Sequence, residues 1–163
     1  MEIVTSASLD EFDRKILDIM QHEGRISMLE LAERVGLSPT PCARRLKRLE
    51  ERGIIDRYVA VLNPEALGMG LDAFVNVRLR DNSKAAAEGF ERAMQTLPEV
   101  AEFYLVTGNY DYLLHLRLAD ANALKEFLRE SLADLPIVGD TLTYIALEQK
   151  KWTTALALPE AIR

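Results

Sequence analysis

The segment VGLSPTPCARRLKRLEERG, residues 35–53, decides the fold of the first third of the chain. Ser38 can cap a helix here, and Pro39 and Pro41 fall in its first turn, where backbone N–H groups have no acceptor within the helix. Apolar and basic side chains then take opposite faces at helical spacing. The apolar face consists of Cys42, Ala43, Leu46 and Leu49. The segment therefore predicts an amphipathic helix with a basic outer face.

Two further helices are predicted before it. Apolar residues in the range 9–20 recur at steps of three and four, which predicts a first helix. Ser27 and Glu30 form the capping pattern of a second helix, which Gly36 ends. Because only two residues separate this second helix from Ser38, the pair has the short link of a helix-turn-helix.

Residues 54–62 predict a strand, because they are rich in β-branched and aromatic side chains. This strand would form a small wing that carries Arg57 and Tyr58. Three helices followed by a wing form a winged helix-turn-helix, to which we assign residues 1–63.

The basic face of the third helix is a candidate DNA contact, although the chain carries a net charge of −6. The acidic excess lies mostly in residues 64–163, which hold ten Lys and Arg against fifteen Asp and Glu. Between Ser38 and Tyr58, in contrast, there are six Lys and Arg and three Asp and Glu. A charged face opposite an apolar one is also typical of any solvent-exposed helix, so the pattern alone leaves that alternative open. The near absence of acids from this face and the short link before it favour DNA.

The hydrophobic period changes after a linker assigned to residues 64–72 on its Pro and Gly content. Alternation with a period of two predicts strands, and apolar residues at helical spacing predict helices between them. In order, these are a strand around 75–79, a helix around 90–97, strands at 100–107 and 112–118, a helix around 124–135 and a strand at 138–147. This βαββαβ order predicts a ferredoxin-like sandwich in residues 73–163, and with the helical first domain the chain has an α+β fold.

Helices in such a sandwich cover one face of the sheet and leave the other face open. We expect this open face to carry Phe74, Phe103 and Leu105. Because a large exposed apolar face is unfavourable in water, a second copy of the chain is its natural cover. The sequence therefore predicts at least a homodimer.

Several functional classes are disfavoured. One cysteine and two distant histidines offer neither a disulfide nor a metal-ligand cluster. No apolar run approaches the roughly 18 residues that span a bilayer, and residues 1–8 do not resemble an export signal, which predicts a cytoplasmic protein with no membrane partner. The ferredoxin-like fold hosts enzymes, but the sequence has no nucleophile motif or phosphate-binding glycine loop. We therefore expect neither catalysis nor a cofactor.

Several stretches of the chain together resemble the leucine-responsive and asparagine regulators, the Lrp/AsnC family. These stretches are residues 9–17, 24–27, 35–42, 48–50 with 53–55, and 108–114, and the similarity runs from Leu9 to about Leu158. The resemblance implies a helix-turn-helix joined to a ligand-sensing α/β sandwich, dimers that assemble into octamers or related rings, and an amino acid as effector. It also implies control of genes for amino-acid metabolism or transport.

The resemblance further implies two sites. The DNA contacts would be Ser38, Thr40, Arg44, Arg45, Lys47 and Arg48, with Ser27 and Arg57 as phosphate contacts. An effector would bind at Tyr104, Gly108, Asn109, Tyr110, Asp111, Gly139, Asp140 and Thr141. The ammonium group of an amino acid would pair with Asp111 or Asp140, and its carboxylate with backbone N–H groups of the glycine turn.

Two alternatives stay open at these sites. Residues 109–111 also fit an ordinary tight turn without a ligand. Asn109 stands where an acidic residue is frequent in the family, which leaves the identity of the effector open. A protein that wraps DNA with little sequence preference would have the same fold, and only its ratio of affinities for operator and random DNA would distinguish it.

Overall fold

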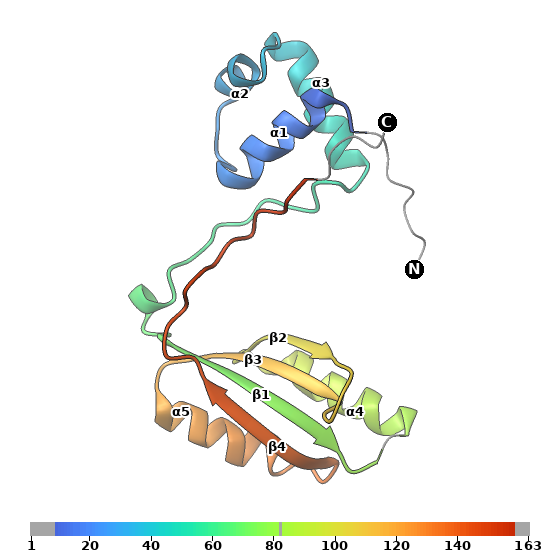
Figure 1. Cartoon of the computed structure of the whole chain (residues 1–163), viewed down its shortest axis with the longest axis vertical. Helices are drawn as coiled ribbons and strands as arrows, with labels where there is room; N and C mark the ends of the chain where they lie inside the picture. Colours follow the sequence, from blue (N-terminus) through green and yellow to red (C-terminus); the bar gives the residue numbers. More distant parts are fainter. Residues whose placement is uncertain (1–8, 82, 159–163) are drawn as a thin grey trace. The chain divides into compact units, whose positions relative to one another are not determined.

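The computed structural model describes residues 9–81 and 83–158. The chain divides into two compact units, one formed by Met1–Val61 with Lys151–Arg163 and the other by Leu62–Lys150. Figure 1 shows the helices of the first unit and the sheet of the second. Each unit has its own hydrophobic core, as expected for two small domains.

The first unit is built from the helices α1 (Glu11–His22), α2 (Met28–Val35) and α3 (Pro39–Glu51). Asp10 caps α1 by accepting a hydrogen bond from the backbone N–H of Asp13. Ser27 caps α2 in the same way through the N–H of Glu30. Gly36 ends α2 with a φ of 81°, a left-handed conformation that glycine adopts without a side-chain clash. These three helices confirm the sequence prediction.

A small core holds the three helices together. Its buried side chains are Ile16, Leu17, Leu31, Ala32, Val35, Cys42 and Leu49. Leu49 has no exposed surface, and Leu46 packs partly buried against the same cluster. The apolar face predicted for α3 is therefore its packing face, and the basic face is turned to solvent.

Residues 54–62, predicted to form the strand of a wing, are not in a strand. Ile54 and Ile55 pack partly buried against the helical core, whereas Tyr58 and Val59 are exposed. A strand needs hydrogen bonds from a neighbouring strand, and suitable side chains alone do not supply them. The predicted strand is therefore wrong, and the segment is an extended connection.

The C-terminal segment from Lys151 belongs to the first unit, although the sequence pattern assigned it to the second domain. The side chain of Gln21 in α1 holds the backbone of Leu156, accepting from its N–H at 2.9 Å and donating to its carbonyl at 3.2 Å. Leu158 packs against the helical core. These partners are 135 residues apart, so no local pattern indicates that they meet.

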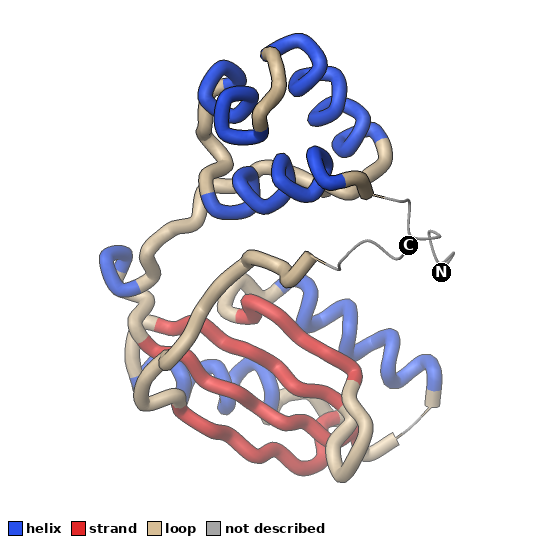
Figure 2. The backbone as a smooth tube through the Cα atoms, turned by 45° about the horizontal axis from the view of Figure 1, so that its top comes forward, coloured by secondary structure: helices blue, strands red, loops and turns tan. Residues whose placement is uncertain are grey.

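The second unit is a four-stranded antiparallel sheet with helices on one face (Figure 2). Its elements are β1 (Leu71–Leu79), α4 (Lys84–Thr96), β2 (Val100–Leu105), β3 (Tyr112–Leu118), α5 (Ala121–Glu126) continued by the π-helix η2 (Phe127–Leu132), and β4 (Val138–Ile145). A 3-10 turn, η1 (Glu65–Leu67), precedes them. The strand order β2-β3-β1-β4 confirms the predicted ferredoxin-like βαββαβ arrangement.

The core of this unit lies between the sheet and the helices. Val75 and Val77 of β1 are fully buried there, and Phe90 of α4 and Phe127 of η2 cover them. Because alternate residues of a strand point to opposite faces, the intervening residues of β1 lie on the open face.

The open face differs from the prediction in two residues. Phe74 lies on it as expected, about one third exposed. Phe103 and Leu105 instead pair with Leu114 and Tyr112, which face the helices, and residues that pair directly share one face. The physical reason is a register shift in β2 between Val100 and Glu102, which reverses the alternation expected from an unbroken strand.

Candidate DNA interface and ligand turn

Most of the cations of α3 lie on the side opposite its buried face. A surface hollow over this side is lined by Arg44, Arg45, Lys47, Arg48 and Glu51. Ser38 and Thr40 are exposed at the start of the helix, and the Ser38 side chain makes no capping hydrogen bond. Small polar groups at a helix start and long cations along it match a recognition helix, in which the former meet base edges and the latter meet phosphates.

Two carboxylates of the α1 region hold two of these cations. Asp13, which is 1% exposed, accepts from Nη1 of Arg45 at 2.9 Å and from Nη2 of Arg48 at 2.7 Å. Asp10 accepts from the same Nη1 of Arg45 at 2.5 Å. Arg45 also lies over the ring of Phe12, 5.3 Å from its centroid. The structure therefore brings Arg45 and Arg48 together in an ion-pair network between α1 and α3.

The network divides the predicted DNA contacts into two groups. The side chain of Arg45 is 25% exposed, and hydrogen bonds to Asp10 and Asp13 raise the pKa of its guanidinium. Burial opposes ionisation of Asp10, but the N–H of Asp13 and the Arg45 guanidinium together lower the pKa of its carboxyl. Lys47 has a 74% exposed side chain and only a 3.6 Å contact with Glu51. Arg45 thus lies in the helix interface, and Lys47 projects into solvent.

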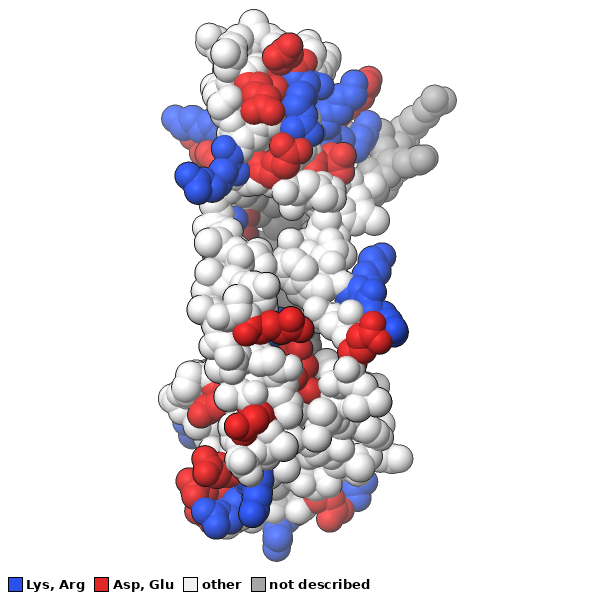
Figure 3. All heavy atoms as spheres, turned by 90° about the vertical axis from the view of Figure 1, so that its left-hand side faces the viewer, with Lys and Arg blue, Asp and Glu red and all other residues white. Residues whose placement is uncertain are grey.

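The two predicted phosphate contacts lie outside α3: Ser27 is the N-cap of α2, and Arg57 lies in the connection that follows α3. The hydroxyl oxygen of Ser27 accepts from the N–H of Glu30, which leaves its O–H free to donate. Arg57 has a 77% exposed side chain 3.6 Å from Asp56. On the face of the first unit seen in Figure 3, cationic and acidic side chains are interleaved.

The hairpin turn between β2 and β3 is closed by its own backbone. The N–H of Val106 donates to the carbonyl of Asp111 at 2.9 Å, and Gly108 has a φ of 121°. The Asp111 carboxylate accepts from the N–H of Leu79 at 2.8 Å. Asp111 therefore ties the turn to the end of β1, a role that competes with its predicted pairing to an effector ammonium.

Arg78 joins the two segments predicted to bind an effector, the hairpin turn and the start of β4, and the sequence prediction did not include it. Its Nε donates to the carbonyl of Asn109 at 2.7 Å, and its guanidinium lies 5.3 Å from the ring centroid of Tyr110. Its Nη1 is 3.5 Å from Asp140, whose side chain is 73% exposed. In the sequence, only the alternation of apolar and polar residues in β1 bears on Arg78, and it places this side chain on the solvent face of the strand.

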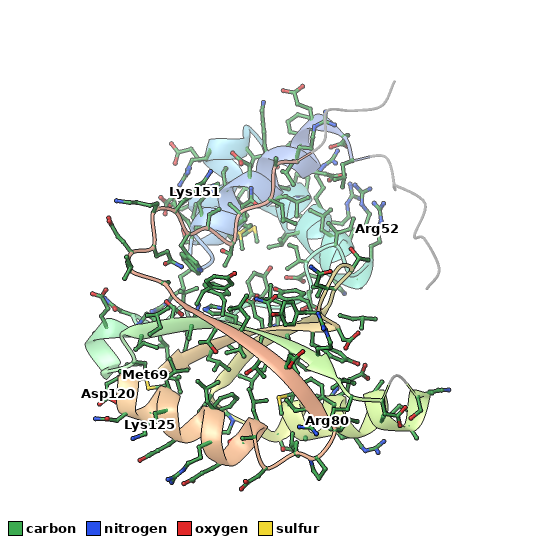
Figure 4. The ribbon with its side chains drawn as sticks, turned by 60° about the horizontal axis from the view of Figure 1, so that its bottom comes forward. Arg52, Met69, Arg80, Asp120, Lys125 and Lys151 are labelled. Atoms are coloured by element: carbon green, nitrogen blue, oxygen red, sulfur yellow. The ribbon has the colours of Figure 1, made fainter. Side chains whose placement is uncertain are left out.

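The segment at the start of β4 packs closely against β1. Arg80, labelled in Figure 4, donates from Nε to the carbonyl of Val138 at 2.8 Å. A Cβ at Gly139 would lie 3.1 Å from the carbonyl oxygen of Arg78, so a larger residue would require the neighbouring backbone to shift by a few tenths of an ångström. Tyr104 lies on β2, where it pairs with Leu113, and its hydroxyl donates to Glu102. Thr141 pairs with Val77 in the sheet.

Comparison with known proteins assigns both units. The family described as "Lrp/AsnC ligand binding domain" matches residues 72–156, and "Winged helix-turn-helix DNA-binding" matches residues 9–56. The chain belongs to the Lrp/AsnC family. It is 45% identical over 150 residues to the leucine-responsive regulatory protein of Escherichia coli K12, covering 92% of each chain. This Lrp/AsnC protein is therefore a DNA-binding transcriptional regulator with a ligand-binding domain.

Solved structures agree with this assignment. A transcriptional regulator of Neisseria meningitidis in complex with L-Met superposes with a TM-score of 0.88 and 42% identity, covering 91% of this chain and 96% of that one. Escherichia coli AsnC gives a TM-score of 0.82 with 26% identity, covering 90% and 97%. The fold predicted for this Lrp/AsnC regulator is thus confirmed.

A second hollow of this Lrp/AsnC regulator lies between α5 with η2 and the edge strand β4. It is lined by Ala121, Leu124, Lys125, Leu128, Arg129 and Ile145. Its surface is almost entirely apolar, and Lys125, labelled in Figure 4, belongs to its lining. Sequence reasoning did not identify this hollow, because it requires α5 and β4 to be placed side by side.

Proposed function

We propose that this Lrp/AsnC regulator binds specific DNA sequences and that an amino acid changes its DNA binding or assembly. Its targets would be genes of amino-acid metabolism or transport. The observation that carries the proposal is the exposed set of cations on α3, placed opposite a buried face in a helix-turn-helix. Because the protein would act on DNA, we propose a cytoplasmic location. No helix of the described residues is long and apolar enough to cross a membrane.

The DNA contacts would come from three parts of the first unit. Arg44 and Lys47 project from α3 without a close carboxylate at hydrogen-bonding distance among the described residues, which suits them to bases and phosphates. Ser38 and Thr40 would meet base edges at the helix start. Arg57, with Ser27, would contact the DNA backbone. Arg45 is the predicted contact least suited to reach DNA, because Asp10 and Asp13 hold its guanidinium in the helix interface.

The effector would bind at the hairpin turn, residues 108–111, and at residues 139–141, which begin β4 rather than forming a loop. Since Asp111 already accepts from the backbone of Leu79, Asp140 is the better partner for the ammonium group of an amino acid. Arg78 and the N–H groups of the glycine turn are suited to its carboxylate. The L-Met complex of the Neisseria meningitidis relative supports an amino acid as ligand class.

A second copy of the chain would cover the open face of the sheet, giving a homodimer that assembles further to an octamer. This face exposes Tyr104, Leu142 and Tyr144 beside Phe74. Burying such groups against a symmetric partner removes apolar surface from water. A dimer also presents two copies of α3, which suits a two-fold DNA site.

Fluorescence anisotropy tests the proposal directly. The purified protein is titrated onto the duplex from upstream of its own gene and onto a scrambled duplex, at one salt concentration, with and without pooled amino acids. Preference for the upstream duplex that changes with amino acids is the expected result. Equal binding to both duplexes would favour a DNA-wrapping protein of low specificity, and absence of binding would refute a DNA-binding role.

A further inference from the structure

The buried carboxylate of Asp13 has a position that core packing does not explain. It lies on α1 with 1% exposure, and each of its oxygens accepts from a different arginine of α3. A buried carboxylate loses its hydration, and two guanidinium donors compensate that loss. The same two hydrogen bonds fix the positions of Arg45 and Arg48 relative to α1.

Arg48 differs from Arg45 in how much of its guanidinium is left to contact DNA. Within the described residues Arg48 hydrogen-bonds only through Nη2, and its side chain is 49% exposed on the surface that carries Lys47. Arg45 is less exposed, is shared between two carboxylates and stacks on Phe12. Asp13 therefore holds one guanidinium inside the helix interface and presents the other at the surface.

We infer that Asp13 is a positioning residue for DNA recognition. It restrains Arg48 in one orientation, so that the free edge of its guanidinium meets one fixed place on the DNA, and it keeps Arg45 from binding phosphates. The inference rests on the proposed function, because it requires α3 to be the DNA-contacting element. An arginine that is already ordered loses less side-chain freedom on binding and discriminates better between correct and incorrect contacts.

Neutralisation is the second part of this role. Asp10 and Asp13 carry two negative charges against the two positive charges of Arg45 and Arg48. An arginine paired to a carboxylate attracts a phosphate less strongly than a free arginine, because the carboxylate offsets its positive charge. Attraction to phosphates is the same for every DNA sequence. Removing the charge of Asp13 should therefore increase binding to arbitrary DNA and reduce discrimination.

The test compares Asp13→Asn with Asp10→Asn. Asp10 contacts Arg45 but not Arg48, and asparagine preserves the helix cap that Asp10 provides, so Asp10→Asn is a matched control. The probes are the duplex that the wild-type protein enriches from a random-sequence pool and a scrambled duplex of the same composition. Enrichment of no sequence by the wild type would refute the proposed sequence specificity before Asp13 is tested.

For Asp13→Asn we expect the affinity ratio between the two duplexes to fall by about tenfold. The slope of log K against log salt should steepen by about one for each protomer that gains a phosphate contact. Asp10→Asn should change the ratio less than about twofold, because Arg48 keeps its partner. A thermal melt first establishes that each variant is folded at the assay temperature.

A double-mutant cycle separates positioning from a general structural effect. Because Asp13 holds both Arg48 and Arg45, Asp13→Asn should change the affinity ratio clearly less in an Arg48→Gln background than in the wild-type background, and the change that remains comes from Arg45. Arg48→Lys offers a second route should Asp13→Asn not fold, since lysine retains the charge but cannot keep the fork geometry. We expect Arg48→Lys to lower the affinity ratio without changing the slope of log K against log salt.

Three outcomes would overturn the inference. These are an unchanged affinity ratio in Asp13→Asn, an unchanged ratio in Arg48→Lys, and additive effects of the two substitutions in the double-mutant cycle.

Discussion

On α3 the side chains of Arg44 and Lys47 project into solvent, opposite the buried face of the helix. At the hairpin turn of the second unit, in contrast, the charged groups bond to one another and to the backbone. Lys47 is 74% exposed, but Arg78 is held by the carbonyl of Asn109 and Asp111 by the N–H of Leu79. Helical periodicity defines the first surface, and tertiary hydrogen bonds define the second. The comparison separates side chains that are exposed to solvent from side chains that are already bonded within the fold.

The largest effect should come from the buried side of α3. Leu49→Ala removes a side chain with no exposed surface and should lower the free energy of unfolding by about 2–5 kcal/mol. Leu29→Ala removes a side chain that is 70% exposed on α2 and should change it by less than about 0.5 kcal/mol. Urea unfolding followed by circular dichroism measures both. Equal losses would contradict the assignment of Leu49 to the packing face.

At the hairpin turn, two carboxylates should separate into structural and ligand-binding roles. Asp111→Ala leaves the N–H of Leu79 without its acceptor and should cost roughly 1–3 kcal/mol of stability. Asp140→Ala removes an exposed carboxylate and should cost less than about 1 kcal/mol.

Isothermal titration with L-Met and the other amino acids supplies the second readout for this pair. Only Asp140→Ala should abolish effector binding while the protein remains as stable as the wild type. A stable Asp140→Ala variant that binds amino acids normally would exclude Asp140 as the ammonium partner.

Within the DNA surface, Arg44 and Arg57 should differ in kind. Arg44→Ala should lower discrimination between specific and scrambled DNA by roughly 1–3 kcal/mol if Arg44 contacts a base. Arg57→Ala should weaken binding to all sequences alike, because a phosphate contact carries no sequence information. Anisotropy titrations on both duplexes measure the two ratios, and equal loss on every duplex for both variants would show that this division of roles is wrong.

The smallest effect concerns the pH dependence of stability through Asp10. Its folded-state pKa is lowered, so ionised Asp10 contributes stability that is present above its ordinary pKa of 3.8 and is lost as pH falls through the lower folded value. Because the side chain is 47% exposed, the contribution should be below about 1 kcal/mol. The difference in unfolding free energy between wild type and Asp10→Asn should shrink as pH falls from above 3.8 through the lower folded-state pKa of Asp10. A difference that does not vary with pH would contradict the ion pair with Arg45.

The sequence predicted what depends on local periodicity. The capping pattern of Ser27 and Glu30 and the apolar face around Leu49 sufficed for the helices, and alternation around Val75 sufficed for β1. The prediction of a strand at 54–62 was wrong because β-branched composition says nothing about a neighbouring strand, and a strand needs one for its hydrogen bonds. The faces predicted for Phe103 and Leu105 were wrong because one register shift in β2 moves every later residue of the strand to the opposite face of the sheet.

The candidate sites depended on contacts that no local pattern contains. Asp13 and Arg48 are 35 residues apart, and Arg78 and Asn109 are 31 apart. Asp13 lies one turn after Asp10, the cap of α1, and only the packing of α1 on α3 reveals Asp13 as the partner of two arginines. Family resemblance supplied candidate residues for each site, and the structure separates those that project outward from those that are already bonded.

The most direct test of DNA binding by α3 is a pair of charge reversals measured by anisotropy on one duplex at one salt concentration. Lys47→Glu and Lys84→Glu change the net charge equally, and each lysine lies 3.6 Å from a glutamate four residues later on an exposed helix surface. We expect Lys47→Glu on α3 to weaken binding by about tenfold or more and Lys84→Glu on α4 by less than about twofold. Equal losses from both variants would mean that net charge, and not the surface of α3, determines DNA binding.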